Sequence, residues 1–128
     1  MVWMMRHPVA RESVEFNDNR ISLFAGQLGK CAITGEYLTR GDVICRRKVP
    51  KWDGGTSEYS NLILVTQAVD DMLSEKDAEF AWELSRRLKL DENKRKKANR
   101  LRVAAGLSPM IQGSRYSNNL TNVGASRG

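Results

Sequence analysis

Two nearby stretches decide the fold of this chain: residues 43–51, Val-Ile-Cys-Arg-Arg-Lys-Val-Pro-Lys, and residues 61–65, Asn-Leu-Ile-Leu-Val. The first begins as a β-prone run, and Pro50 ends it because proline has no amide to donate to a strand ladder. The residues between the two stretches favour a loop, in which Gly54–Gly55 is free to adopt positive φ. The second stretch leads into a helix expected near Gln67–Leu73.

Another β-prone run, Cys31–Ile33, lies upstream of the first stretch. Thr34–Gly35 and Gly41–Asp42 stand between it and Val43–Cys45, and both are pairs that favour turns. The two runs therefore predict a short hairpin or a zinc-knuckle-like turn.

A helix is predicted ahead of these runs, from about Asn19 to Leu28. Asn17–Asn19 offers capping side chains, and Gly29 stands where a left-handed helix end is expected. Between these signals, apolar residues recur at roughly helical spacing, at Ile21, Leu23, Phe24 and Leu28.

Two further helices are predicted in the second half of the chain. The first spans Asp77–Leu90, with an apolar stripe at Phe80, Ala81, Leu84 and Leu88. The second spans Asp91–Ala105, where Asp91 supplies the cap, Gly106 ends the helix and Pro109 prevents it from resuming.

Taken together, these segments predict an α+β fold. A short β-hairpin plus helix forms its core, with an N-terminal helix before it and two C-terminal helices after it. A chain of 128 residues is long enough for one modest domain. Residues 111–128 are rich in Ser, Asn and Gly, so we expect a flexible polar tail there.

Composition narrows the setting and the partners. No apolar run approaches the roughly 20 residues of a membrane span, and the first residues lack the features of a signal peptide. The two cysteines, Cys31 and Cys45, are too few for a disulfide framework, so we expect the reducing cytoplasm of a bacterial cell and no membrane partner. A net charge of +6 and a pI near 9.6 suit nucleic acid, or an acidic protein surface, as partner.

Positive charge is concentrated in the last predicted helix and in the strand-and-loop region. Such a run is either a solvated helix face or a phosphate-binding surface. Trp52 lies in the loop and either stacks on a base, docks into a partner or anchors the loop by partial burial. The candidate residues for binding nucleic acid or a protein partner are Arg46, Arg47, Lys48, Lys51, Trp52, Lys94, Arg95, Lys96, Lys97, Arg100 and Arg102.

Several segments together resemble the HNH endonuclease domain of bacterial group II intron reverse transcriptases (maturases). They run from about Phe16 to Pro109 and comprise Asp18–Phe24, Gly29–Glu36, Gly54–Thr56 with Tyr59, Asn61–Val65 and Asn99–Pro109. The resemblance implies an HNH-like ββα domain over residues 16–110, after an N-terminal extension over residues 1–15. The family's domain nicks target DNA so that reverse transcription can be primed. We expect this chain to be a freestanding version, without the reverse transcriptase.

The chain departs from the family at the active site. The family's Cys-His-His is Cys45–Arg46–Arg47 here, and the histidines of the next helix are replaced by Asp70 and Ser74, with Thr66 at a further His position. Asn61 is retained. An HNH site needs imidazoles as neutral metal ligands and as general base, whereas arginine stays protonated and offers only donors. We therefore expect a degenerate site with no catalytic residue, no metal and no cofactor.

The arginines suggest what has replaced the metal. Two guanidinium groups in a former cation site would repel a divalent ion, and Asp70 lies on the helix that faces the strand. Our hypothesis is that an ion pair of Arg46 or Arg47 with Asp70 joins strand and helix instead. The alternatives are that Arg46–Lys48 is a solvated strand end or contacts a partner directly.

The remaining motif residues have structural interpretations as well. Cys31 and Cys45 are either small buried core residues or remnants of a metal site. Asn61 has no catalytic histidine to orient, so we expect it to bond the backbone of the loop.

The sequence is compatible with three alternative functions. The first is a catalytically inactive HNH-derived domain that binds nucleic acid, DNA or RNA, through its cations. The second is an inhibitor or adaptor of phage or mobile-element origin that binds a bacterial nuclease or defence complex, as anti-CRISPR proteins do. The third is a residual nuclease that uses Asp42, Asp70, Asp71 or Cys45 as metal ligands.

Overall fold

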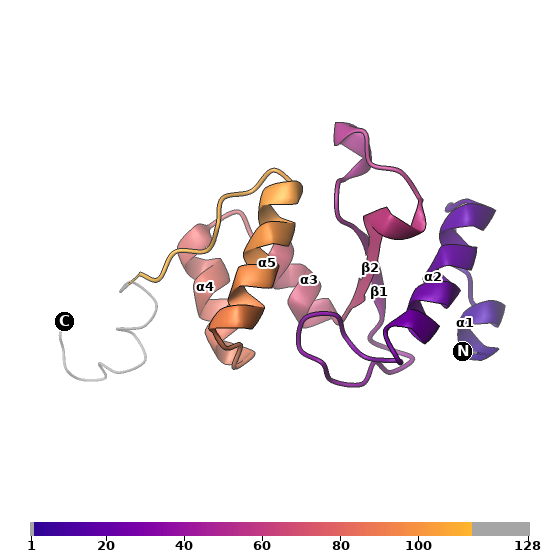
Figure 1. Ribbon diagram of the computed structural model, residues 1–128, viewed down its shortest axis with the longest axis horizontal. Helices are drawn as coiled ribbons and strands as arrows, with labels where there is room; N and C mark the ends of the chain where they lie inside the picture. Colours follow the sequence, from indigo (N-terminus) through magenta and orange to yellow (C-terminus); the bar gives the residue numbers. More distant parts are fainter. Residues whose placement is uncertain (1, 114–128) are drawn as a thin grey trace. The chain divides into compact units, whose positions relative to one another are not determined.

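The computed structural model describes residues 2–113 and has the α+β fold that the sequence predicts (Figure 1). Within these residues there are five α-helices, two short 3-10 helices and one antiparallel pair of strands. The chain divides into two compact units, Met1–Asp70 and Asp71–Gly128, and the division falls inside α3, which spans Gln67–Ser74. No helix among the described residues is long and apolar enough to cross a bilayer.

The sheet of the first unit pairs β1 (Ile44–Arg47) with β2 (Leu62–Val65). All four residues of β2 are buried, because the strand is apolar at every position and α2 (Val14–Gly26) lies beside it (Figure 1). The predicted pairing of Cys31–Ile33 with Val43–Cys45 is therefore wrong. The continuous apolar run of β2 buries more surface as the partner of β1 than three residues can.

Residues 31–35 form a tight turn in place of the predicted strand. The amide of Gly35 donates to the carbonyl of Cys31 at 3.0 Å, and the amide of Cys31 donates to the carbonyl of Glu36 at 2.7 Å. Cys31 and Ile33 are buried, so the turn packs its apolar side chains into the core of the first unit.

The N-terminal helices differ from the prediction. A short helix α1 spans Val2–Arg6, and α2 begins five residues earlier than predicted, because Ser13 caps it by accepting from the amide of Phe16. Asn17 lies inside α2 and instead accepts from the amide of Val9 at 2.7 Å. The helix ends at Gly26, two residues before the predicted end, and the left-handed backbone that follows includes Leu28, with a φ of +58°, as well as the predicted Gly29, with a φ of +71°.

The loop between the strands holds two 3-10 helices, η1 (Lys51–Asp53) and η2 (Tyr59–Asn61). It leads through β2 into α3, as the sequence predicts. The amide of Gln67 donates to Asp42 Oδ1 at 2.6 Å, and Thr66 Oγ1 accepts from the amide of Val69 at 3.3 Å, so both side chains cap the start of α3.

The second unit contains the two predicted C-terminal helices. Helix α4 spans Ala78–Arg87 and α5 spans Glu92–Ala104, and both begin at the predicted aspartates: Asp77 accepts from two amides of α4, and Asp91 accepts from the amide of Lys94. Gly106 ends α5 with a φ of +89°. The core of this unit is formed by Met72, Leu73, Ala81, Leu90, Ala98 and Leu101.

The segment after α5 returns along α4, where the amide of Ile111 donates to the carbonyl of Ala78 at 3.1 Å. Most of the predicted flexible tail, residues 114–128, lies outside the described residues.

Candidate functional site

Arg46 and Arg47 are adjacent at the end of β1. Arg46 stands opposite Ile63 and Arg47 opposite Leu62. Successive side chains of a strand point to opposite faces, so the two guanidinium groups cannot line one pocket together. Each is held by a different part of the first unit, which corrects the expectation of a single cationic pocket.

Arg46 forms the ion pair proposed from the sequence. Its Nη1 lies 2.9 Å from Asp70 Oδ1, on the first turns of α3, and the two side chains are 11% and 24% exposed. The strand is thereby joined to the helix that follows the sheet. The alternative pairing, Arg47 with Asp70, is not formed.

Arg47 is held mainly by Glu12, which lies in the predicted N-terminal extension. Its two terminal nitrogens donate to the two carboxylate oxygens of Glu12 at 3.1 and 3.0 Å, and Nη2 also donates to Ser57 Oγ at 2.9 Å. The guanidinium carbon lies 4.9 Å from the centre of the Phe16 ring. A planar cation paired in two-point fashion is strongly fixed, so Arg47 fastens residue 12 and the loop to the sheet.

The electrostatics of Glu12 reflect this environment. The hydrogen bonds from Arg47 hold the pKa of the Glu12 carboxyl below its usual value, and the charges of Arg47 and Lys51 act in the same direction. Lys51 Nζ lies 3.8 Å from Glu12 and is 62% exposed. Neither Arg46 nor Arg47 has the exposure of a free phosphate-binding cation, because their side chains are mostly buried and paired.

Asn61 bonds the loop backbone, as predicted. Its Oδ1 accepts from the amide of Val49 at 2.9 Å, and its Nδ2 donates to the carbonyls of Val49 and Thr56 at 3.0 and 2.9 Å. The amide of Lys48 donates to the Asn61 carbonyl at 2.7 Å. One side chain therefore closes both ends of the loop that connects the strands.

The two glycines of this loop serve different purposes. Gly54 has a φ of +87°, as predicted, and open space where a Cβ would stand. Gly55 is not in the positive-φ region, but a Cβ there would lie 1.6 Å from the carbonyl oxygen of Val49. The second glycine is required by close packing of backbone on backbone, which the sequence analysis did not foresee.

Trp52 projects from η1 and is 86% exposed. The interpretation of this residue as a partly buried anchor is therefore wrong, and the two binding interpretations stay open. Lys48 is half-buried, and Lys51 is the exposed cation next to Trp52.

The candidate metal ligands are occupied elsewhere or dispersed. Asp42 caps α3 and Asp70 pairs with Arg46. Cys31 is buried, and burial raises the pKa of the Cys45 thiol to about 12, so it stays protonated at neutral pH. Ser74 is exposed at the end of α3. Over residues 2–113, no three His, Cys, Asp or Glu side chains gather in a group that could hold a metal ion.

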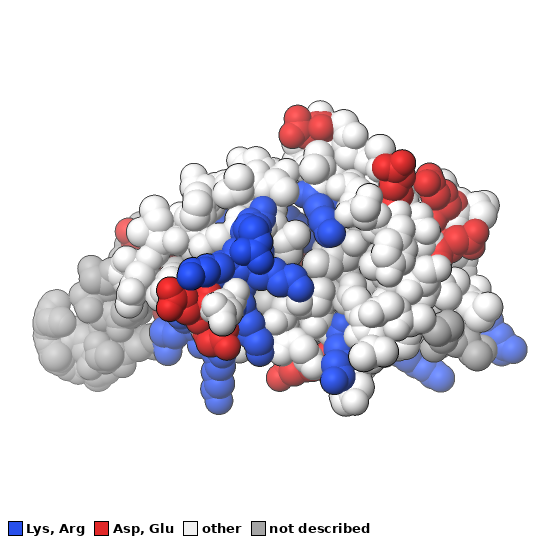
Figure 2. Space-filling view, viewed as in Figure 1, with Lys and Arg blue, Asp and Glu red and all other residues white. Residues whose placement is uncertain are grey.

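The cations of α5 divide into an exposed and a buried set. Lys96, Lys97 and Arg100 are exposed and recur at three- and four-residue spacing on one helix face, with Lys94 half-buried beside them. Figure 2 shows Lys and Arg side chains gathered over α5. We call Lys96, Lys97 and Arg100 the α5 cation row.

Arg102 is not part of a binding surface, which corrects its assignment from sequence. The side chain is fully buried, with Nε donating to the carbonyl of Ser108 at 2.9 Å and Nη1 donating to the carbonyls of Met72 and Glu75 at 2.9 and 2.6 Å. Its charge is used to join the end of α3 and the segment after α5 to the core of the second unit.

Arg95 lies between these extremes. Its guanidinium carbon is 4.0 Å from the centre of the Trp82 ring, and its Nε donates to Ser85 Oγ at 2.9 Å. Both Trp82 and Arg95 are half-buried, so part of the stacked pair reaches the surface. The same unit holds a buried carboxylate, Glu83, which pairs with Arg86 and Arg87 at the end of α4.

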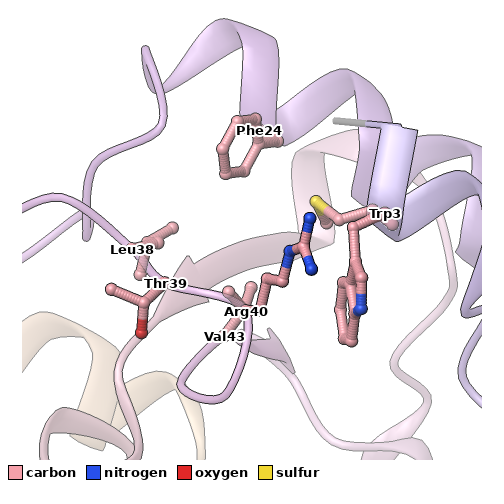
Figure 3. Close-up of a pocket in the computed structure, with 7 residues that line it drawn as sticks. Trp3, Phe24, Leu38, Thr39, Arg40 and Val43 are labelled. Carbon is pink, nitrogen blue, oxygen red and sulfur yellow. The ribbon is translucent and has the colours of Figure 1, made fainter.

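A small, mostly apolar pocket of about 290 Å³ lies in the first unit, away from the predicted site residues (Figure 3). Trp3, Phe24 and Leu38 line it, and the side chain of Arg40 extends between Phe24 and Trp3 (Figure 3). None of the residues predicted to bind a ligand or partner contributes to it.

Sequence reasoning missed two groups of positioning residues. Glu12 and Ser57 hold Arg47, and Gln27 exchanges hydrogen bonds with the backbone of Leu64 through both ends of its carboxamide. No periodic pattern marks these residues. The burial of Arg102 did leave a signal, since it shares a helix face with Ala98 and Leu101.

Searches against protein-family models, curated proteins and solved structures found no match for this chain.

Proposed function

We propose that this chain is a catalytically inactive HNH-derived domain that binds the phosphate backbone of nucleic acid through the α5 cation row. The proposal of HNH descent is supported by the order of strand, glycine-containing loop, strand and helix, and by the place of Asn61 at the ends of that loop. It assumes the reducing cytoplasm of a bacterial cell, in which the two free cysteines persist.

Loss of catalysis is inferred from the chemistry of the substituted residues. Arg46 and Arg47 can neither ligate a cation nor accept a proton, and each is engaged with a carboxylate. Asp42 caps α3, and Asp70 neutralises Arg46. Incubation of supercoiled plasmid with the protein and Mg²⁺ or Mn²⁺ tests this inference, and we expect no nicking. Nicking that is abolished in Asp70→Ala would overturn it.

The observation that carries nucleic-acid binding is the α5 cation row itself. Lys96, Lys97 and Arg100 are exposed cations on one helix face, and each can approach a phosphate. Lys96 has only an exposed pair with Glu92 at 3.7 Å, and exposed pairs of this kind contribute little. Contacts of this class are blind to sequence and sensitive to salt.

A titration of labelled oligonucleotides at low salt tests the proposal directly. We expect the unaltered protein to bind, and Lys97→Glu to weaken binding by at least tenfold, because it turns an attraction into a repulsion. Arg40→Glu is the matched control: it makes the same change of charge at an exposed residue of the other unit and should alter affinity much less. Absence of binding at low salt, or equal effects of the two variants, would eliminate the α5 row as the binding surface.

A second candidate function is favoured by Trp52. A tryptophan that is 86% exposed on a loop closed by Asn61 has the character of an interface hot spot, as in an inhibitor or adaptor that binds a bacterial nuclease or defence complex. Co-purification of a stoichiometric protein that is lost in Trp52→Ala, while oligonucleotide binding is retained, would support this function over the first.

A further inference from the structure

The second unit contains a groove of about 470 Å³ next to the α5 cation row. Its size is within the range of about 300–1,000 Å³ that is typical of pockets for small molecules. It lies between α4, α5 and the returning segment, and its lining residues are Trp82, Glu92, Arg95, Lys96, Asn99 and Gln112.

One wall of the groove is a pre-formed stacking platform. The Arg95 guanidinium lies on the Trp82 ring at 4.0 Å, and its Nε donates to Ser85 Oγ. Ser85 is fully buried, and its hydroxyl also donates to the carbonyl of Trp82 at 2.6 Å. The Ser85 oxygen that accepts from Arg95 is therefore held in place, and it fixes the orientation of the guanidinium group. Unpaired bases stack on aromatic rings such as indole and on planar guanidinium groups.

Polar groups at the edge of the groove supply both donors and acceptors. Asn99 Oδ1 accepts from the amide of Met110 at 2.8 Å, and this bond fixes the plane of the carboxamide and hence the direction of its Nδ2 donor. The Glu92 carboxylate is an acceptor with an 84% exposed side chain. A nucleobase edge needs both kinds of partner, because every base carries donors and acceptors.

Lys96 offers a positive charge to the phosphate next to a base bound in the groove. Lys96 lines the groove and also belongs to the α5 cation row, so one residue connects the stacking platform to Lys97 and Arg100. A phosphate at Lys96 would be followed by further phosphates along the row.

From this arrangement we infer that the groove holds an unpaired base of single-stranded nucleic acid, stacked on the Trp82–Arg95 pair, with the strand continuing along the α5 cation row. The inference rests on the proposed function and narrows its ligand class. A base within a duplex has both faces stacked on its neighbours and cannot enter, so the groove makes the protein selective for single strands.

The test compares an oligothymidine and an oligouridine with a blunt duplex of equal phosphate number, using the full chain. Three variants are titrated alongside: Trp82→Leu, which keeps an apolar side chain but removes the ring, Arg95→Lys, which keeps the charge but removes the plane, and Lys97→Glu from the cation row. A fourth protein, Trp3→Phe with Trp52→Phe, leaves Trp82 as the sole indole.

We expect the unaltered protein to favour the single strands. Trp82→Leu and Arg95→Lys should each lower single-strand affinity by roughly tenfold while changing duplex affinity less than about twofold, because only the single strand stacks. Lys97→Glu should weaken the binding of both the single strands and the duplex. In the single-tryptophan protein, oligothymidine or oligouridine should quench the fluorescence of Trp82, and circular dichroism checks that each variant is folded.

Three other results would contradict the inference, and they differ in whether the proposed function survives. Equal affinity for strands and duplex, or equal losses of both in Trp82→Leu, overturns the groove and leaves the cation row standing. Binding of single strands without any quenching of Trp82 overturns the groove as well. If no oligonucleotide binds at low salt, the proposed function itself fails and this inference with it.

Discussion

Arg46 joins β1 to α3 through its ion pair with Asp70. A permanent cation stands at the end of a strand and is neutralised by one carboxylate of the following helix. The pair is only partly buried, so its contribution should lie between that of an exposed pair, about 0–1 kcal/mol, and that of a fully buried one, about 3–5 kcal/mol when one partner is removed.

Truncation of Asp70 tests this pair. We expect Asp70→Ala to lower the free energy of unfolding by about 2 kcal/mol, because it leaves the mostly buried Arg46 without its carboxylate. The measurement is urea denaturation of Asp70→Ala, Arg46→Ala and the double variant, which yields their coupling energy. Asp18→Ala, which removes an exposed carboxylate, should change stability by less than about 0.5 kcal/mol. A coupling energy of zero would mean that the pair does not join strand to helix.

Glu12 makes the stability of the first unit dependent on acid. Its folded pKa is depressed by Arg47, so its stabilising contribution is complete above the ordinary glutamate pKa of 4.5 and is lost as the pH falls below that value. We expect Glu12→Gln to be less stable than the unaltered protein at pH 7, by about 1 kcal/mol, and the difference to shrink toward pH 3.

Thermal melts between pH 7 and pH 3 measure that difference. Glu36→Gln, which alters an exposed carboxylate, serves as the control and should parallel the unaltered protein throughout. A stability difference between Glu12→Gln and the unaltered protein that stays constant over this range would show that the charge of Glu12 is not what stabilises the pair.

The sequence predicted the contacts of single residues where the partners belong to one motif, and it did not where the partners are distant in the chain. The role of Asn61 and the pairing of Arg46 with Asp70 follow from their places in one short motif. Glu12 and Arg47 are 35 residues apart in the chain, and no local motif around either residue indicates that the other is its partner. Arg102 was misassigned because a run of charge was given more weight than its position on a buried helix face.

The elements show the same contrast between local and distant determinants. Helices α4 and α5 begin at the predicted aspartates, because an N-cap depends on residues within one turn. The partner of β1 was misidentified, because strand pairing depends on which apolar run covers the core. The loop that joins β1 to β2 is held closed by the side chain of Asn61 and by the close packing of Gly55 on Val49.

Substitution of the two loop glycines separates their purposes. Gly54→Ala should cost about 1 kcal/mol, from positive φ alone, since nothing lies near its Cβ. Gly55→Ala should cost clearly more, because its Cβ would collide with the carbonyl of Val49 and force the loop open. Urea denaturation of both variants provides the measurement. Equal costs, or a larger cost at Gly54, would contradict the described packing of the loop.

For the whole molecule, the positive charge is unevenly divided along the chain. Residues 1–70 carry nine Lys or Arg against eight Asp or Glu, whereas residues 71–128 carry twelve against seven. In the first unit, moreover, two of the nine cations form the ion pairs of β1. Net charge was readable from composition, but which cations remain at the surface depends on burial and pairing.

Salt dependence tests how many cations engage phosphates. If the three cations of the α5 row each neutralise one phosphate of a duplex, the logarithm of the binding constant should fall with the logarithm of salt concentration with a slope of about −3. Lys97→Glu should make that slope shallower by about 1, and Arg40→Glu should leave it unchanged. A slope near zero would mean that binding does not depend on phosphate contacts.

We propose that the two arginines of β1, each paired with a carboxylate, occupy the place that a divalent metal has in an HNH site. Titration of the protein with Mn²⁺, followed by the electron paramagnetic resonance signal of the free ion, tests it most directly. We predict that the protein leaves the free-ion signal unchanged at concentrations where a metal-dependent nuclease would be loaded. Stoichiometric loss of the signal that disappears in Asp70→Ala would contradict the account.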